Sequence, residues 1–375
     1  MLKAGVCLEM GVAKGRFPCR QTATVTSNRT GGRHLFAAFL LVVCIFIFVY
    51  VYGAFQLRRS KIDVLSHSEL VAVVQANIPQ DVKWNETAWP AILDEYKALT
   101  LEAVKHRPKL IIWPETSFPG YLWEDRYLFD ELTQFVKDVG IPLLFGSVVK
   151  DNGRYYNSAI LLSSKGEIVS RYDKLHLVPF GEYIPLRGLL PFLEDIVPIG
   201  DFTPGRQYTV FPFPYGKAAS ERGENFSVLI CFEDTIPELS RGFVKQGAGL
   251  LINITNDGWF KDSIAPYLHL QSSVFRTIEN RRPLVRAANT GISCFIDSCG
   301  RVYKYVLGRG GKKTYVSGYA VGNVNFGSQK SFYSIFGDMF AFFCIGIAVL
   351  WLLFQIVRGG RNRGKSVLGN ADPTW

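Results

Sequence analysis

Three side chains suited to covalent catalysis stand at comparable places in the sequence, each at the end of an apolar stretch. Glu115 ends LIIWPE, Lys174 ends SRYDK and Cys231 ends SVLIC. Cysteine is a strong nucleophile near neutral pH only as the thiolate, so a neighbouring base must take its proton. A carboxylate in an apolar setting has a raised pKa and suits that task. A fixed ammonium, together with a backbone N–H after the nucleophile, would stabilise the charge that develops on a carbonyl oxygen under attack.

Each of these residues also has an ordinary structural interpretation. A cysteine at the end of a strand is most often a packed core residue, and a glutamate there is usually a solvated edge or a helix cap. A lysine near a hairpin is usually a surface charge. Position in the sequence alone favours these ordinary interpretations. A catalytic interpretation therefore depends on the motifs that surround the three residues.

The region from residue 69 to residue 325 alternates between two kinds of apolar pattern. Compact runs of Val, Ile and Leu predict buried strands, and apolar residues at helical spacing predict helices between them. This alternation implies an α/β sheet that is covered on both faces, with its site beyond the carboxyl ends of the strands. The expected strands are 71–78, 109–115, 141–149, 155–163, 167–174, 226–233, 249–257, 284–291, 293–297, 301–306 and 314–321. The expected helices are 86–106, 124–138, 266–281 and one that starts near residue 237.

Two segments outside this region are long and apolar. Residues 35–55 contain no charged side chain, and residues 339–357 form a similar run. Helices of this length span the hydrocarbon core of a bilayer, and a soluble core helix rarely stays apolar on every face for so long. The first segment is also long for a signal peptide, and no A-x-A-like cleavage site follows it. The two segments are therefore predicted to be transmembrane helices.

The formal net charge of +10 is concentrated beyond these two segments, in residues 1–34 and in the tail 358–375. The positive-inside rule places both basic segments in the cytoplasm and the intervening domain on the other side of the membrane. Arg58, Arg59 and Lys61 argue the other way for the first helix. No nucleic-acid-binding motif accompanies the basic residues, so no nucleic-acid partner is expected.

The sequence predicts neither a metal site nor an organic cofactor. The seven cysteines have no metal-ligand spacing, and the C-x4-C pair of Cys294 and Cys299 is weak evidence for zinc or a disulfide. Neither a Walker motif nor a G-x-G-x-x-G is present. A site built on Glu115, Lys174 and Cys231 needs none of these groups.

The sequence motifs around the three residues resemble those of the nitrilase superfamily with its Glu–Lys–Cys triad. They are LIIWPETSFP (110–119), YDKLHLVPFGEYIP (172–185), LICFED (229–234) and NITNDGWF (253–260). With the flanking apolar segments, they are similar to the apolipoprotein N-acyltransferase family in particular. QANIPQDVKW (75–84) and RPLVRAANTGIS (282–293) also resemble that family, and the resemblance runs from about residue 70 to the last apolar segment.

This resemblance implies a four-layered αββα sandwich flanked by transmembrane helices. It makes Cys231 the nucleophile, Glu115 the general base and Lys174 the oxyanion stabiliser. Phe232 stands where tyrosine is commoner in the family, so any role of that hydroxyl is lost. The positions that the resemblance further marks as supporting the site are Trp84, Glu182, Phe232 and Glu233.

The implied reaction has two steps and needs no cofactor. The cysteine takes an acyl chain from a phospholipid as a thioester, and then passes it to the α-amino group of the diacylglyceryl-cysteine of a lipoprotein. The implied location is the bacterial inner membrane, with the catalytic domain on the periplasmic face. The apolar segment 186–204 and the aromatic stretch Phe118–Leu122 are candidate lids or lipid-facing segments, with ordinary loop packing as the alternative.

Two other functions remain open from the sequence. A membrane-anchored amidase or nitrilase that uses water as acceptor would need the same three residues. An inactive fragment that only binds lipoproteins or partner subunits would need none of them. Members of the family carry several more transmembrane helices ahead of this domain, whereas one apolar segment precedes it here. A truncated gene, a misplaced start, and one half of a split enzyme with a missing membrane-domain partner are the alternatives that this difference leaves open.

Overall fold

A computed structural model describes residues 29–63, 68–185, 202–214, 224–261 and 263–367. Parts of the basic segment 1–34, of the apolar segment 186–204 and of the tail 358–375 lie outside these ranges. The expectation that 186–204 faces lipid therefore falls largely on residues that the structure does not describe.

The described part of the catalytic region contains two six-stranded sheets. The first has the order β12 (Gly318–Asn325), β1 (Ser68–Gln75), β2 (Leu110–Ile112), β3 (Leu143–Asp151), β4 (Arg154–Leu162) and β5 (Ile168–Asp173). The second has the order β11 (Val302–Tyr305), β10 (Cys294–Ile296), β9 (Leu284–Ala288), β8 (Leu250–Thr255), β7 (Asn225–Ile230) and β6 (Phe211–Pro212).

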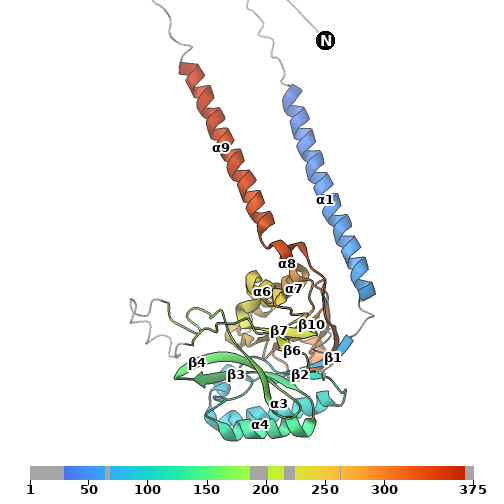
Figure 1. The fold of residues 1–375 in the computed structure, drawn as a ribbon, viewed down its shortest axis with the longest axis vertical. Coiled ribbons are helices and arrows are strands. Elements are labelled where there is room, and N and C mark those ends of the chain that lie inside the picture. The colour runs from blue at the N-terminus through green and yellow to red at the C-terminus, as the bar shows by residue number, and fades with distance from the viewer. Residues whose placement is uncertain (1–28, 64–67, 186–201, 215–223, 262, 368–375) are drawn as a thin grey trace, which may run out of the picture. The chain divides into compact units, whose positions relative to one another are not determined.

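Helices cover the outer face of each sheet, as Figure 1 shows. The first sheet carries α3 (Trp89–Val104) and α4 (Arg126–Val139), and the second carries α6 (Pro237–Lys245) and α7 (Ala265–Asn280). The predicted four-layered αββα sandwich is therefore confirmed. The shorter helices are α2 (Gln80–Lys83), α8 (Phe332–Phe336) and the 3₁₀ turns Glu86–Ala88, Cys231–Thr235, Asp257–Phe260 and Arg309–Gly311.

The continuous apolar runs of the strands follow from burial on both faces. In β1, Val71 and Val73 pack into the core between the two sheets, whereas Ala72 and Val74 pack against the layer of α3 and α4. Successive side chains of a strand point to opposite faces, so a strand between two cores must be apolar at every position. The same logic explains β2 and β8, which are buried throughout, and β7, which is buried from Phe226 to Ile230.

Two parallel sets of strands bring distant motifs to the same edges. β1, β2 and β3 run parallel in the first sheet, and β7, β8 and β9 run parallel in the second. β4 and β5 form the antiparallel hairpin predicted around Lys165 and Gly166. β12 pairs antiparallel with β1 and lies a few residues beyond the expected strand 314–321.

The aromatic stretch Phe118–Leu122 is part of the core. Phe118 is 1% exposed and Leu122 is fully buried. The ring of Phe118 lies 6.0 Å from that of Phe145 and 6.3 Å from that of Phe129. The expectation of a lipid-facing segment at these residues is wrong, because the rings fill the space between β3 and α4.

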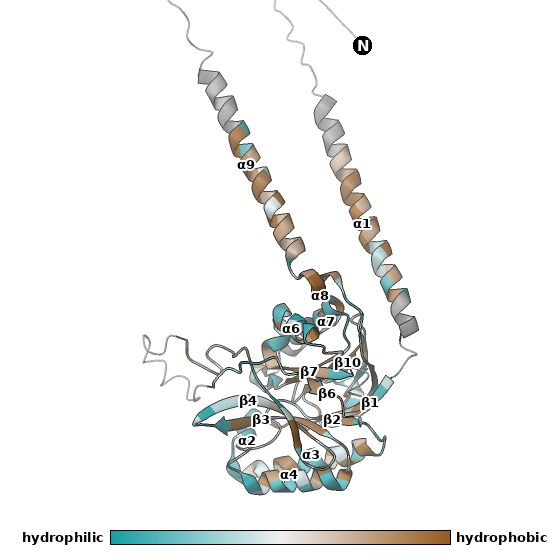
Figure 2. Ribbon diagram, in the orientation of Figure 1, coloured by the Kyte–Doolittle hydropathy of each residue, from teal (hydrophilic) through white to brown (hydrophobic). Residues whose placement is uncertain are grey.

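Two described helices, α1 (Arg29–Asp63) and α9 (Met339–Val367), are long and apolar enough to cross a membrane. Their apolar windows cover Phe36–Arg58 and Met339–Arg358, and none of either window is buried. The expected segments 35–55 and 339–357 lie in these helices, which are coloured mostly as hydrophobic in Figure 2.

Candidate active site

Cys231 sits at a sharp turn where β7 gives way to a 3₁₀ turn. Its φ of 54° is left-handed, and its side chain is 8% exposed. For a residue other than glycine this backbone conformation costs about 1–2 kcal/mol, so other contacts must hold it. The carbonyl oxygen of Cys231 accepts a hydrogen bond from Asn253 Nδ2 at 3.0 Å, and His269 Nε2 lies 3.2 Å from the same oxygen.

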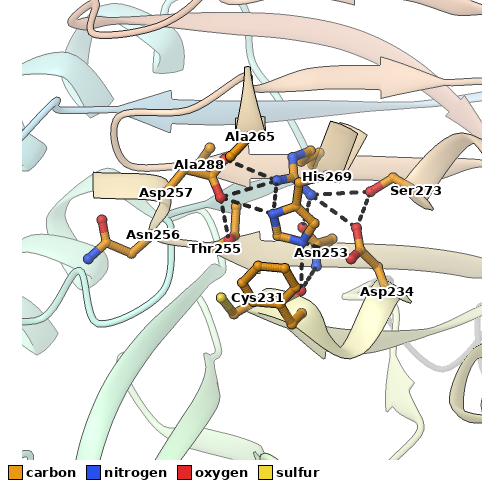
Figure 3. Close-up of polar contacts among 12 residues, drawn as sticks. Cys231, Asp234, Asn253, Thr255, Asn256, Asp257, Ala265, His269, Ser273 and Ala288 are labelled. Atoms are coloured by element: carbon orange, nitrogen blue, oxygen red, sulfur yellow. Dashed lines mark hydrogen bonds and ion pairs between the residues drawn. The ribbon is translucent and has the colours of Figure 1, made fainter. Parts of the chain in front are cut away.

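The residues that hold this carbonyl belong to a buried charged network (Figure 3). Its members come from β8, β9, α7 and the 3₁₀ turns Cys231–Thr235 and Asp257–Phe260. His269 Nε2 lies 2.8 Å from Asp234 Oδ1, and His269 Nδ1 lies 3.0 Å from Asp257 Oδ1. Arg286 donates to Asp234 Oδ2 at 3.0 Å, to Asp257 Oδ2 at 3.1 Å and to Asn253 Oδ1 at 2.6 Å. The backbone of Cys231 is thus held in place by groups that the sequence did not indicate as part of the site.

Glu115 approaches from the carboxyl end of β2, and its two oxygens are occupied by different donors. Asn157 Nδ2 donates to Oε1 at 2.8 Å, and the backbone N–H of Asn256 donates to Oε2 at 2.8 Å. The backbone carbonyl of Glu115 accepts from Lys83 Nζ at 3.1 Å. The carboxylate is 6% exposed and cannot rotate freely, because both oxygens are held.

Lys174 follows β5 and lies between two carboxylates. Its Nζ is 2.8 Å from Glu182 Oε2 and 3.8 Å from Glu115 Oε1, and its side chain is 1% exposed. Asn157 Nδ2 also donates to Glu182 Oε1 at 2.8 Å, so one amide joins both glutamates. Burial lowers the pKa of Lys174, but Cys231 and the two carboxylates outweigh it and raise the net pKa, so the group is an ammonium at neutral pH.

The thiol of Cys231 is electrostatically coupled to both groups. Burial raises its pKa, Glu115 raises it further, and Lys174 opposes them, as does the Thr255 hydroxyl that hydrogen-bonds to the thiol. The resting group is therefore a neutral thiol. A base must remove its proton during the reaction, and the structure places Glu115 and Lys174 in the same buried cluster as Cys231.

Glu233 contacts the backbone on either side of the site and lies outside the cluster formed by Cys231, Glu115 and Lys174. It accepts hydrogen bonds from the N–H of Ile230 at 2.8 Å, from the N–H of Leu175 at 2.7 Å and from the Tyr172 hydroxyl. Burial raises the pKa of Glu233 to about 7, although these donors favour the charged form. Glu233 therefore ties the end of β7, before the nucleophile, to the segment that follows Lys174.

The remaining predicted positions differ in their surroundings. Phe232 stacks on the ring of His269, with centroids 4.7 Å apart, and meets Phe260 edge-on.

Trp84 is 46% exposed, whereas its neighbour Lys83 is 5% exposed and faces the site. Burial lowers the pKa of Lys83 to about 8. Lys83 was missed in the sequence because a lysine beside a tryptophan on a short helix carries no pattern of its own.

Gly146 on β3 allows the backbone of Glu115 to approach the sheet. A Cβ at this position would lie 2.5 Å from Thr116 N and 2.6 Å from Glu115 Cα, both of which are backbone atoms. We expect Gly146→Ala to displace Glu115 and to lower activity at least tenfold while the protein still folds. Steady-state turnover and the thermal unfolding midpoint would check this, with Gly318→Ala as the control, because a Cβ at Gly318 would meet only Val306 Cγ1 at 3.4 Å, an ordinary van der Waals distance. Wild-type turnover in Gly146→Ala would contradict the positioning role.

Asp257 gives the buried network a defined pH dependence. Burial raises its pKa, but Arg286 and His269 outweigh burial and lower it to about 2 from 3.8. A carboxyl with a depressed folded-state pKa contributes stability above its unfolded pKa and loses it as pH falls through the folded value, here about 2 kcal/mol in total. We expect the wild-type unfolding midpoint to fall between pH 4 and pH 2. Asp257→Asn should have a lower unfolding midpoint than the wild type at pH 7, and its midpoint should fall less between pH 4 and pH 2. If the plots of midpoint against pH were parallel for the two proteins, this role of Asp257 would be ruled out.

The fold and the buried cluster define a class of protein: an α/β sandwich of two sheets covered by helices, with a buried cysteine at a strand end. The sequence matches the carbon-nitrogen hydrolase family over residues 70–316, and the chain belongs to that family. An amidase from Nesterenkonia sp. has a similar fold, with a TM-score of 0.51 at 20% identity over 68% of this chain and 90% of the amidase. In the E41L mutant of that amidase, the acetamide moiety of fluoroacetamide is covalently added at the active-site cysteine.

Curated relatives with much higher sequence identity are apolipoprotein N-acyltransferases. The enzyme of Geobacter metallireducens is 39% identical over 82% of this chain and 58% of its own length. Those of Brucella melitensis and Chlorobaculum tepidum are 38% and 32% identical and are covered over 48% and 61% of their lengths. The chain thus spans about half the length of the curated relatives that it matches.

Proposed function

We propose that this protein is an N-acyltransferase that moves a fatty acyl chain from a membrane phospholipid to the N-terminal amine of diacylated lipoproteins. The observation that carries the proposal is the buried thiol of Cys231, coupled to one carboxylate and one ammonium, in a chain with two apolar helices. The high identity to apolipoprotein N-acyltransferases supports the choice of donor and acceptor. No metal or organic cofactor takes part in this reaction.

In the first half-reaction, Glu115 takes the thiol proton as the sulfur of Cys231 attacks the ester carbonyl of the phospholipid. Negative charge forms on the carbonyl oxygen, and the ammonium of Lys174 stabilises it. The C–O ester bond then breaks, and the leaving lysophospholipid alcohol takes the proton from Glu115. The product is an acyl thioester on Cys231.

In the second half-reaction, the α-amino group of the lipoprotein attacks the thioester carbonyl. Glu115 accepts a proton from the attacking nitrogen, the C–S bond breaks, and the sulfur takes the proton back. The acyl chain is now an amide of the lipoprotein, and Cys231 is again a thiol. Glu182 pairs with Lys174, and Asn157 donates to both Glu115 and Glu182, so these two residues hold Lys174 and Glu115 in place through both steps.

The proposed location follows from the two apolar helices and the charge around them. α1 and α9 span the bacterial inner membrane, and the basic segments 1–34 and 358–375 remain in the cytoplasm. The catalytic domain then faces the periplasm, where a donor phospholipid and a lipoprotein acceptor meet it at the bilayer surface.

The test supplies the full chain in vesicles of phosphatidylethanolamine and phosphatidylglycerol with a diacylated lipopeptide. We expect mass spectrometry to show one added acyl chain on the α-amine and an equal amount of lysophospholipid. Hydrolysis of small amides or release of free fatty acid, without lipopeptide acylation, would show a hydrolase instead. A folded sample in which acyl donors never label Cys231 would show a non-catalytic fragment and end the proposal.

A further inference from the structure

Helix α7 has its polar side inside and its apolar side outside. Its buried residues are the polar residues His269, Ser273, Arg276, Thr277 and Asn280, together with Pro266 and Leu270. Of these, His269, Ser273 and Arg276 contact Asp234, which follows Cys231 in the same 3₁₀ turn. Its exposed residues are Tyr267, Leu268, Gln271, Phe275 and Ile278, and the preceding Ile264 is 69% exposed. Within Ala265–Asn280, all of which is described, no exposed position is charged. A helix on the surface of a soluble domain normally has the opposite arrangement.

The exposed residues lie on one face of the helix. From Ile264, the positions follow at three, four, seven, eleven and fourteen residues, which is the spacing of a single helical stripe. The buried side of α7 is polar because it must reach Asp234, Asp257 and the carbonyl of Cys231. That requirement does not explain the apolar outer side, whose burial away from water would be favourable.

Helix α8 extends this surface. It packs against α6 and α7, and the Ser331 hydroxyl that caps it donates to the carbonyl of Glu279 at the end of α7. Arg241 of α6 also donates to the carbonyl of Ile335 at 2.8 Å. α8 exposes Phe332, Ile335 and Phe336, and it is strongly hydrophobic in Figure 2. These three residues and the exposed residues of α7 together form what we call the α7–α8 face.

The course of the chain indicates what covers this face. α8 ends at Phe336 and α9 begins at Met339, so only Gly337 and Asp338 separate them. Phe336 and Met339 are three Cα–Cα steps apart, so the two helix ends are separated by at most about 11 Å. α8 must therefore lie at the bilayer surface if α9 inserts from Met339 onward. Aromatic and aliphatic side chains without charge suit the boundary between lipid headgroups and acyl chains.

We propose that the α7–α8 face lies against the lipid bilayer, with its side chains in the boundary between headgroups and acyl chains. The face is on the opposite side of α7 from His269, which contacts the carbonyl of Cys231. Only one helix would then separate the bilayer from the nucleophile. This inference rests on the membrane insertion of α9 proposed above, and it is independent of the chemistry at Cys231.

The experiment uses the full chain in vesicles of phosphatidylethanolamine and phosphatidylglycerol that contain a phospholipid with a diazirine on its acyl chain. After irradiation, mass spectrometry maps the labelled peptides. We expect labelling of Ile264–Ile278 and of α8 to exceed that of α4, on the opposite layer, by at least fivefold. Labelling of α7 at the level of α4, while α9 is labelled, would overturn the proposal.

Matched variants test the face directly. The double variant Leu268→Glu with Phe275→Glu places two charges on the α7–α8 face. The control variant Leu101→Glu places one charge on the outer side of α3, where Leu101 is 52% exposed. We expect the double variant to lose most of the α7 labelling and keep that of α9, and Leu101→Glu to match the wild type.

Two other outcomes would contradict the proposal. If α7 is not labelled by lipid and instead cross-links to α7 of a second chain, the face is a dimer interface and the proposal is overturned. Absence of label on α9 would contradict the membrane insertion on which this inference rests. Acyl transfer measured in detergent would test the proposed function independently of that result.

Discussion

Replacing Cys231 with alanine is expected to abolish acyl transfer while the domain stays folded. Removal of the nucleophile of a triad enzyme lowers turnover by about six orders of magnitude, because the other members have no covalent intermediate to act on. The variant removes one buried sulfur and leaves the carbonyl of Cys231, to which Asn253 donates, on the backbone. Stability should therefore change by only about 1–2 kcal/mol.

Two measurements separate loss of chemistry from loss of fold. Intact-protein mass spectrometry after incubation with phospholipid should show an acyl adduct on the wild type and none on Cys231→Ala. The thermal unfolding midpoints of the two proteins should agree within a few degrees. Cys299→Ala is a suitable control, because Cys299 is a free thiol outside the site, and it should keep the adduct. If Cys231→Ala transferred acyl chains at the wild-type rate, the assignment of the nucleophile would be wrong.

The strands and helices of the catalytic region could be predicted well because burial on both faces leaves a strong pattern. The runs that contain Glu115 and Cys231 proved to be central parallel strands, with the reactive residues just beyond their carboxyl ends. The fold therefore follows from alternation of apolar runs, which is a local property of the sequence. The boundaries moved by a few residues, as for β12, because strand ends depend on pairing partners.

The groups behind the nucleophile could not be predicted in the same way. His269 lies on a helix whose inner side is polar, so periodicity alone would place its apolar side in the core. Arg286 is fully buried in a strand among apolar neighbours, and only its contacts with Asp234 and Asp257 explain its presence there. A buried charge is justified by partners that are distant in sequence, and one sequence does not reveal them.

Phe118–Leu122 illustrates the opposite error. An aromatic stretch beside a reactive glutamate suggested contact with lipid, yet its rings pack between β3 and α4. The exposed apolar residues that the sequence did not single out lie on α7, where they alternate with buried polar residues. Hydrophobicity by itself does not say which side of an element faces the core, since that depends on what the opposite side must contact.

Replacing Lys174 with methionine is expected to impair both stability and catalysis. The ammonium lies 2.8 Å from Glu182 and 3.8 Å from Glu115, so its removal leaves two buried carboxylates without their cation. Breaking a buried ion pair from one side costs about 3–5 kcal/mol. Loss of an oxyanion donor separately lowers turnover by about 10²–10³-fold.

The double variant Lys174→Met with Glu182→Gln separates these two effects. Glutamine keeps the shape of Glu182 and removes one of the two unpaired charges, so most of the lost stability should return. Turnover should not return, because the cation that faces Cys231 and Glu115 is still missing. Thermal unfolding and single-turnover formation of the thioester would be measured on the wild type, both single variants and the double variant. If acylation recovered in parallel with stability, Lys174 would be a structural counter-ion for Glu182 and not the group that stabilises the transition state.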